Sequence, residues 1–397
     1  MTRRISFSAL LLAASTLLLL SACNDALNNE EQITTAESGP QLPSVPFNYS
    51  VADYPDHFFE AVGPGSVISM DNEPADNQLT DEGATLGRVL FYDKNLSANR
   101  SVSCGSCHQQ ETGFSDSRIL SVGFDGGLTG RHSMSLGNAR FYQNGRFFWD
   151  ERAATLEEQV LGPIQDPVEM GMTLEELVTR IEEQDYYPTL FRDAFGDEEV
   201  SSDRVSKALA QFVRSMSTYQ SRYDEGRAAV NNPIDDFPNF TAEENRGKAL
   251  FILPRNQGGF GCAACHTGEA QVALAPHNIG LDRVNEDDGA FGVYGRPESD
   301  GAFKVPSLRN VALRAPYMHD GRFDNLMEVM GHYSRGIQPN PSLSAILTEE
   351  GVTGGTPVRL GINRDESMAL IAFLETLTDE QFIRDERFSD PFGASNQ

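Results

Sequence analysis

Residues 104–108 read CGSCH, and residues 262–266 repeat this pattern as CAACH. Two thiols one turn apart can add to the two vinyl groups of a haem, and the adjacent histidine then reaches the iron from one side. Each string could instead be a thioredoxin-like dithiol, a zinc site or a disulfide loop. The histidine directly after both pairs favours covalent haem c. The predicted attachment residues are Cys104, Cys107, Cys262 and Cys265, and the predicted proximal iron ligands are His108 and His266.

A longer repeat surrounds these strings. GRVLF at 87–91 is matched by GKALF at 247–251, 160 residues further along the chain. One module of cytochrome size therefore occurs twice. We expect two cytochrome c-like haem domains, an N-terminal one at 80–235 and a C-terminal one at 236–390, with the boundary in the run NNPIDDFPNF.

Helical patterns dominate the rest of the sequence. Thr173-x-x-Glu176 and Thr241-x-x-Glu244 are capping boxes, which predict that a helix begins after each threonine. Apolar residues at helical spacing predict two further helices, while alternating runs typical of strands are scarce. These apolar stripes consist of Val205, Leu209, Phe212, Val213 and Met216, and of Leu370, Phe373, Leu374 and Leu377. We predict a mainly α fold with long irregular loops.

The N-terminus has the features of an export signal. Arg3 and Arg4 precede an apolar run from Leu10 to Leu20, which is too short to span a membrane comfortably. Cys23 directly after Leu-Ser-Ala resembles a bacterial lipobox, although an ordinary cleaved signal is the alternative. We expect a lipoprotein signal peptide at 1–22, lipidation of Cys23, and a periplasmic protein anchored to the membrane. The polar composition after Cys23 predicts a flexible tether and N-terminal extension over 23–79.

The net charge of the chain is strongly negative. There are 58 acidic and 31 basic residues, for a net charge of −27, which becomes −29 when Arg3 and Arg4 leave with the signal peptide. Nucleic acid and anionic surfaces are therefore poor partners. A solvated acidic exterior explains the charge, and attraction of a basic protein partner is the alternative. The oligomeric state stays open, with a homodimer among the alternatives.

Three longer segments resemble the bacterial di-haem cytochrome c peroxidase and MauG family. They are LGRVLFYDKNLS at 86–97, FFWDERAATLEEQVLGPIQDPVEMG at 147–171 and VPSLRNVALRAPYMHDGRF at 305–323. The resemblance extends over nearly all of the chain after residue 80. It implies that the two haems lie at the interface of the two domains. It also implies that the N-terminal haem reacts with hydrogen peroxide and that the C-terminal haem supplies electrons to it.

The resemblance also implies roles for three side chains. Glu169 and Gln159 match the residues that line the peroxide pocket, and Trp149 matches an electron relay between the haems. Glu169 would carry a proton between the two peroxide oxygens, as a partly desolvated carboxylate can. Without the resemblance, Glu169 would be interpreted as a solvated loop acid, Gln159 as an exposed helix residue and Trp149 as a core aromatic.

The loop after the first haem string departs from the family pattern. Many members carry a histidine there that caps the iron until the other haem is reduced, whereas SVGFDGGLTGR at 121–131 offers Phe124. Phenylalanine cannot bind iron, so we predict an open first haem unless His132 or Met134 moves in.

A second departure lies in MGHYSRG at 330–336. The usual sixth ligand of the second haem is a methionine, and the register places Tyr333 at this position, which is the MauG-like choice. A phenolate stabilises ferric and higher iron states more than a thioether does. Met330, one helical turn earlier, and His332 are the alternative ligands.

The family also holds a calcium ion through an asparagine and nearby carbonyl groups. These carbonyls match Arg314 and Pro316 here, but the asparagine position holds His132. Imidazole is a poor ligand for a hard cation, so calcium binding is doubtful. Of the remaining histidines, His277 and His319 are predicted to hydrogen-bond structural or haem-edge groups, and His57 to lie on the surface.

Together these features predict a di-haem c-type peroxidase that consumes hydrogen peroxide at the His108 haem and exchanges electrons with the His266 haem. Phe124 and Tyr333 favour MauG-like oxidation of a protein partner. One alternative is a conventional cytochrome c peroxidase that takes electrons from a small cytochrome or cupredoxin. Another is a di-haem electron carrier without catalysis.

Overall fold

The computed structural model describes residues 39–61, 65–272 and 274–393, and the predicted signal peptide and Cys23 lie outside these ranges. Its α helices are α1 (Asp81–Tyr92), α2 (Cys104–Cys107), α3 (Leu156–Gln165), α4 (Leu174–Glu182), α5 (Tyr187–Phe195), α6 (Ser202–Ser215), α7 (Arg222–Ala228), α8 (Ala242–Ile252), α9 (Phe291–Tyr294), α10 (Leu326–Gly331) and α11 (Arg364–Glu375). Within the described ranges, extended segments pair only through isolated β-bridges. The predicted mainly α fold is confirmed.

Short turns of other helix types connect these helices. The 3₁₀ turns are η1 (Asp56–Phe58), η2 (Ile68–Met70), η3 (Lys94–Leu96), η4 (Gln110–Thr112), η5 (Ala139–Phe141), η6 (Arg255–Gln257), η7 (Cys262–Ala264), η8 (Pro297–Ser299), η9 (Val311–Leu313), η11 (Ala345–Leu347), η12 (Phe382–Arg384) and η13 (Glu386–Phe388). A π-helical turn, η10 (His332–Gly336), continues directly from α10.

The helix starts follow the capping signals of the sequence. The Thr173 hydroxyl accepts the backbone N–H of Glu176 (3.1 Å), and the Glu176 carboxylate accepts the backbone N–H of Thr173 (2.8 Å). Thr241 and Glu244 form the same reciprocal pair before α8. Both predicted capping boxes are therefore confirmed. They satisfy backbone N–H groups at the helix start that have no partner within the helix. The two predicted apolar stripes lie on α6 and α11, except that Met216 and Leu377 come just after the ends of these helices.

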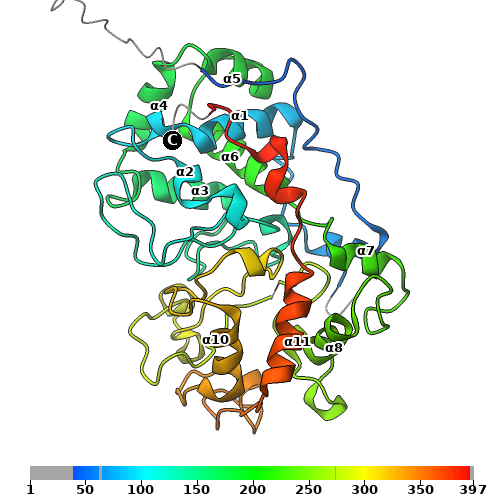
Figure 1. Ribbon diagram of the computed structural model, residues 1–397. Helices are drawn as coiled ribbons and strands as arrows, with labels where there is room; N and C mark the ends of the chain where they lie inside the picture. Colours follow the sequence, from blue (N-terminus) through cyan, green and yellow to red (C-terminus); the bar gives the residue numbers. More distant parts are fainter. Residues whose placement is uncertain (1–38, 62–64, 273, 394–397) are drawn as a thin grey trace, which may run out of the picture. The chain divides into compact units, whose positions relative to one another are not determined.

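The sequence repeat corresponds to a repeated helix pair. Helix α1 packs on α6, and α8 packs on α11 (Figure 1). A Cβ atom at Gly87 in α1 would lie 2.0 Å from the carbonyl oxygen of Ala208 in α6. A Cβ atom at Gly247 in α8 would lie 1.8 Å from the carbonyl oxygen of Ala369 in α11. Both repeats therefore use glycine where two helix backbones approach closely.

Replacing Gly247 by alanine is expected to destabilise the protein. The added methyl group would overlap the backbone of α11, and such overpacking costs about 1–3 kcal/mol of the free energy of unfolding. Gly292 in α9 is a suitable control, because a Cβ atom there would meet no atom within 4 Å. Urea unfolding of both variants checks this expectation, which fails if Gly247→Ala is as stable as Gly292→Ala.

The hydrophobic side chains form two main clusters, and three segments depart from the predicted domain boundaries. Tyr223 packs with the second cluster, whereas Phe382 and Phe388 near the C-terminus pack with the first. In the N-terminal extension, the Tyr49 phenol donates to the carbonyl oxygen of Arg387 (2.7 Å). Tyr49, within the segment 23–79 that is predicted as a tether and N-terminal extension, is therefore packed against the C-terminal segment.

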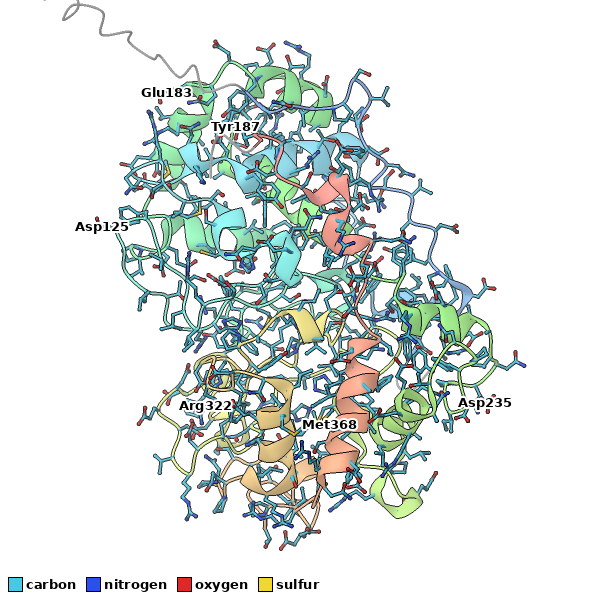
Figure 2. All side chains as sticks on the ribbon, in the orientation of Figure 1. Asp125, Glu183, Tyr187, Asp235, Arg322 and Met368 are labelled. Atoms are coloured by element: carbon cyan, nitrogen blue, oxygen red, sulfur yellow. The ribbon has the colours of Figure 1, made fainter. Side chains whose placement is uncertain are left out.

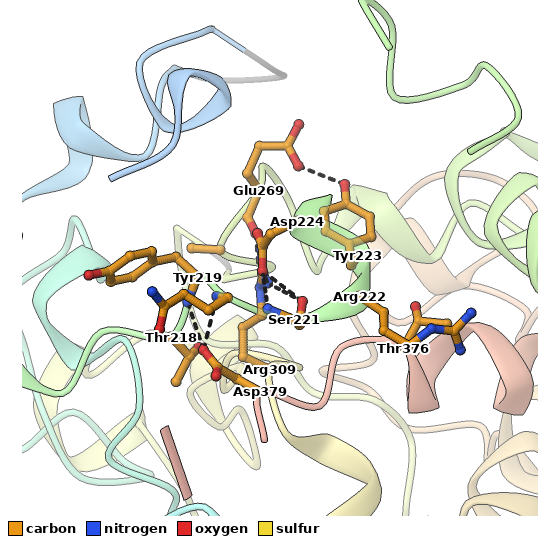
Figure 3. Close-up of polar contacts among 12 residues, drawn as sticks. Thr218, Tyr219, Ser221, Arg222, Tyr223, Asp224, Glu269, Arg309, Thr376 and Asp379 are labelled. Atoms are coloured by element: carbon orange, nitrogen blue, oxygen red, sulfur yellow. Dashed lines mark hydrogen bonds and ion pairs between the residues drawn. The ribbon is translucent and has the colours of Figure 1, made fainter. Parts of the chain in front are cut away.

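A buried ion-pair network holds the loop after the second Cys-x-x-Cys-His string (Figure 3). The Arg309 guanidinium donates to the Asp224 carboxylate (2.8 Å) and to the main-chain oxygen of Glu269 (2.6 Å), three residues after His266. His57 also contacts Asp224, with 3.0 Å between Nε2 and Oδ1. The predicted surface position of His57 is wrong, because this pairing draws the histidine into the interior.

Acidic side chains at separated positions account for part of the negative charge. Asp125, Glu183 and Asp235 are exposed and point outward in Figure 2. In the described part of the chain, every helix is too short or too polar to cross a membrane.

Candidate active site

Both Cys-x-x-Cys-His strings are closed by the same backbone hydrogen bond, although the first forms the short helix α2 and the second the 3₁₀ turn η7. In the first, the His108 N–H donates to the carbonyl oxygen of Cys104 (3.0 Å), and in the second, the His266 N–H donates to that of Cys262 (3.0 Å). All four cysteines of the strings are free thiols. Each turn therefore presents two thiols and a histidine together, as the repeat predicts.

The first string opens into a cavity of about 560 Å³, which Cys104, Cys107 and His108 line. The Nδ1 atom of His108 lies 2.9 Å from the carbonyl oxygen of Phe114. This contact orients the ring and leaves Nε2 available as a ligand. Burial lowers the pKa of His108, which keeps the imidazole neutral, as iron binding requires.

The predicted peroxide residues line the same cavity. Gln159 and Pro163 lie one turn apart on α3, and Glu169 follows this helix. The Asp166 carboxylate accepts the backbone N–H groups of Val168 (2.8 Å) and Glu169 (3.2 Å), which fixes the turn. Burial, helped by the negative charge of Asp166, raises the pKa of Glu169 to about 7. A carboxyl group with this pKa can both accept and return a proton near neutral pH.

The Phe124 and His132 rings near the first cavity are held in other contacts. The Phe124 ring packs over Gly171, where an added Cβ atom would meet it at 2.4 Å. His132 is buried, with Nε2 at 3.2 Å from the Ser115 hydroxyl and Nδ1 at 3.1 Å from the Arg118 carbonyl oxygen. Met134 lines the cavity, and its backbone contacts His108 and helps to raise the pKa of His108 against the effect of burial. A cap on the first iron from His132 would therefore require its two hydrogen bonds to break.

The second string opens into a smaller and largely apolar cavity of about 230 Å³. Burial first, and then the charge of the buried Arg314, lowers the pKa of His266 to about 4. The histidine is therefore neutral and suited to bind a metal. Burial likewise lowers the pKa of Arg314, to about 10.

Helix α10 and the π-helical turn after it place the candidate sixth ligands. Tyr333 and Met330 both line the second cavity. His332 points elsewhere, because its Nε2 lies 3.0 Å from the carbonyl oxygen of Ile279. Burial, and then the nearby thiols of Cys265 and Cys262, raise the pKa of Tyr333. A π-helical turn within a helix is frequent at functional sites, and here it ends the α-helical register just before Tyr333.

Trp149 borders both cavities, as an electron relay requires. Its indole N–H donates to the carbonyl oxygen of His132 (2.8 Å), and its own carbonyl oxygen accepts the backbone N–H of Lys304 (2.8 Å). His319 lies beside the Trp149 ring, with 6.4 Å between the ring centroids, and stacks on Phe303. His277 also lines the second cavity, with Nδ1 at 3.1 Å from the Ser344 hydroxyl.

Lys304 is a site residue that the sequence reasoning missed. It borders both cavities, and its Nζ atom lies 3.7 Å from the centroid of the Tyr142 ring. Burial lowers the pKa of this ammonium group to about 7, although the charge of Glu151 opposes the effect. The sequence FKVP around Lys304 does not predict that this lysine is buried between two cavities, since its burial arises from contacts with residues far away in the sequence.

The two cavities fit one haem each. Each contains two free thiols and the buried, neutral histidine of its own Cys-x-x-Cys-His string, together with a wall of mainly apolar side chains. Within the described ranges, no group of three or more histidine, cysteine or acidic side chains converges closely enough to hold a metal ion directly.

Comparisons with known proteins agree with this arrangement. Residues 81–230 match the sequence profile of a family described as di-haem cytochrome c peroxidase. The methylamine utilization protein MauG of Methylorubrum extorquens is 36% identical over 309 residues, which cover 77% of this chain and 81% of that protein. The cytochrome c551 peroxidase of Nitrosomonas europaea is 32% identical over 311 residues, which cover 75% of this chain and 80% of that protein.

A solved structure shows the same fold. A MauG-like protein associated with microbial copper homeostasis aligns with a TM-score of 0.70 at 32% identity, over 87% of this chain and 99% of the other. The described helices therefore follow a fold that this related protein shares.

Proposed function

Because the chain belongs to the di-haem cytochrome c peroxidase and MauG family, whose members are haem oxidoreductases, we propose that it consumes hydrogen peroxide at its first haem and oxidises a protein partner. The observation that carries this proposal is Glu169, which faces the same cavity as His108. The family implies two haem c groups. Cys104 and Cys107 would hold one covalently, and Cys262 and Cys265 the other.

Glu169 and Gln159 perform the proton chemistry in this proposal. When bound, the haem supplies the iron that accepts peroxide and the electrons that split its O–O bond. The Glu169 carboxylate takes the proton from one peroxide oxygen and returns it to the other, which leaves as water. The Gln159 amide orients the peroxide by hydrogen bonding.

The residues around the second haem favour MauG-like oxidation over simple peroxide removal. Tyr333 and His266 would hold the iron of the second haem, with Met330 as the alternative to Tyr333. A phenolate ligand stabilises oxidised iron, so this haem would share the oxidising equivalents instead of only passing electrons on. Trp149, which borders both cavities, would relay electrons between the two haems.

A conventional cytochrome c peroxidase is the second candidate, and the similarity to the Nitrosomonas cytochrome c551 peroxidase favours it. Steady-state assays with hydrogen peroxide and a reduced small cytochrome or cupredoxin separate the two functions. Rapid multiple-turnover oxidation of either donor would support the conventional peroxidase. Slow turnover with both, together with consumption of peroxide, supports oxidation of another protein. A plain electron carrier would consume no peroxide in either assay.

The reaction with peroxide is expected to depend on the protonation of Glu169. As a base, Glu169 must be ionised, and its pKa is raised to about 7. The rate constant should therefore rise with pH up to about 7 and level off above it, and at pH 5 it should be about a hundredfold below the plateau. Stopped-flow mixing across this pH range checks the profile. A rate that stays flat from pH 5 to 8 would show that Glu169 is not the base.

We further propose that Cys23 carries a lipid and anchors the protein to a membrane on the periplasmic side. A Cys23→Ser variant should move from the membrane fraction to the soluble fraction and lose incorporation of labelled fatty acid. Retention of the variant in the membrane fraction, with the label still attached, would contradict lipidation at this residue.

The calcium site that the family resemblance implies has a poorer set of ligands in this protein. The carbonyl oxygens of Arg314 and Pro316 would supply two ligands, while the His132 ring nitrogens already contact Ser115 and the Arg118 carbonyl. His132 therefore offers ring nitrogens at the position where a hard cation prefers a side-chain oxygen.

A further inference from the structure

Glu151 occupies a backbone conformation that rarely holds a glutamate. Its φ is +58°, in the left-handed region, and its side chain is fully buried. The turn at 147–153 recurs at 317–323, and the same antiparallel bridge closes both. The equivalent position of the second turn holds Gly321, whose φ is +66°. A buried glutamate where the repeat uses glycine is strained, and such strain is often kept for a function of the side chain.

The Glu151 carboxylate joins two tyrosines. The Tyr142 phenol donates to Oε1 and the Tyr294 phenol donates to Oε2, both in short hydrogen bonds. The amide of Asn144 also donates to Oε2 (2.9 Å). Tyr142 is buried, whereas Tyr294 in α9 is partly exposed and Asn144 is exposed. The network therefore leads from the interior to the surface.

The inner end of this network lies at the wall of the first haem cavity. Tyr142 lines that cavity, and so do Trp149 and Lys304. The Lys304 ammonium lies over the Tyr142 ring, while its backbone N–H donates to the carbonyl oxygen of Trp149. An electron can therefore leave Tyr142 toward the haem without crossing a thick layer of protein.

A tyrosine loses an electron readily only when its phenolic proton has an acceptor. Burial, and then the charge of Glu151, raise the pKa of Tyr142, so the phenol keeps its proton until it is oxidised. We propose that Tyr142 and Tyr294, coupled through Glu151, are a redox-active pair that carries oxidising equivalents from the first haem cavity to the surface. There the pair would oxidise an electron-rich aromatic group of a partner, such as a phenol or an indole. The inference rests on the proposed function, because hydrogen peroxide is the oxidant.

Each transfer balances. Tyr142 gives one electron to the haem centre oxidised by hydrogen peroxide, and its O–H bond breaks as the proton moves to Oε1 of Glu151. Tyr294 then gives an electron to the Tyr142 radical. Tyr142 takes its proton back from Glu151, and the Tyr294 proton moves to Oε2. Finally the partner gives an electron to the Tyr294 radical, which recovers its proton from Glu151, while the proton of the partner goes to solvent. Two such rounds supply the two electrons that reduce one peroxide to water.

Freeze-quench electron paramagnetic resonance on the di-haem protein tests the proposal. One equivalent of hydrogen peroxide is added to the ferric protein without a partner, while the haem absorption spectrum is followed in parallel. We expect a tyrosyl radical whose hyperfine splitting narrows when the protein carries ring-deuterated tyrosine, a test that needs no substitution. The signal should disappear in Tyr142→Phe and fall at least tenfold in Glu151→Gln, which cannot accept the proton. Tyr294→Phe should hold the radical on Tyr142.

Tyr187→Phe is the matched control, because the buried Tyr187 phenol also donates to a carboxylate, that of Asp93 (2.7 Å), but does not line either cavity. Its radical signal should equal that of the unaltered protein. The proposal is overturned if the haem spectrum changes but ring deuteration leaves the radical signal unaltered, or if Tyr142→Phe keeps the full signal. A haem spectrum that does not respond to peroxide would instead contradict the proposed function, and this inference with it.

Discussion

Replacing Glu169 by glutamine is expected to slow the reaction of the ferric protein with hydrogen peroxide by about 10²–10⁴-fold. Glutamine keeps the size of the side chain but cannot take up the peroxide proton. A substitute base would have to be another carboxylate that lines the first haem cavity. Besides Glu169, the acidic lining residues are Asp150, Asp166 and Asp287. Asp166 is engaged by two backbone N–H groups, and Asp150 and Asp287 by Arg131.

The rate should be measured by stopped-flow absorption at pH 7 and again over the range in which Glu169 titrates. Glu175→Gln in α4 is the matched control, because Glu175 is exposed and lies outside the lining of both cavities. The control should react like the unaltered protein, and Glu169→Gln should lose the pH dependence as well as the rate. Equal rates for the two variants would remove Glu169 from the proton chemistry.

Replacing Tyr333 by methionine is expected to raise the reduction potential of the second haem by on the order of a hundred millivolts or more. A thioether stabilises ferrous iron relative to a phenolate, so the variant should accept electrons from a small cytochrome more readily. The variant should therefore gain activity as a conventional peroxidase while its ability to hold oxidising equivalents falls. Spectroelectrochemical titration of each haem measures the change.

Met330 provides the control for this prediction, since it lines the same cavity. Met330→Leu should leave both the potential and the low-spin haem signals unchanged if Tyr333 is the ligand. The opposite pattern, with a changed potential in Met330→Leu and an unchanged one in Tyr333→Met, would assign the ligand to Met330.

Local signals explain why much of the fold could be predicted from the sequence. The capping pairs at Thr173 and Thr241 involve residues three positions apart, so their geometry does not depend on distant contacts. The repeated glycines Gly87 and Gly247 likewise indicated one module that occurs twice, and both lie at the crossing of two helices. Neighbouring residues determine the capping pairs, and the repeat is visible because the same short pattern occurs twice in the sequence.

Long-range contacts explain what the sequence did not reveal. His57 is buried because Asp224, 167 residues away, accepts its hydrogen bond. Lys304 carries no local pattern that would place it between two cavities. Glu151 did carry a signal, since FFWDERA at 147–153 and YMHDGRF at 317–323 share an aspartate and an arginine, and the position between them holds glutamate in the first and glycine in the second. Comparison of the two repeats with each other would have identified it.

The measurement that tests the central claim most directly is the absorption spectrum of the purified ferric protein after one equivalent of hydrogen peroxide, without prior reduction. Phe124 cannot cap the first iron, and His132 is held by Ser115 and a backbone carbonyl, so we predict that both haem spectra change at once and that the oxidised state persists. A protein that reacts only after one haem has been reduced would contradict this account.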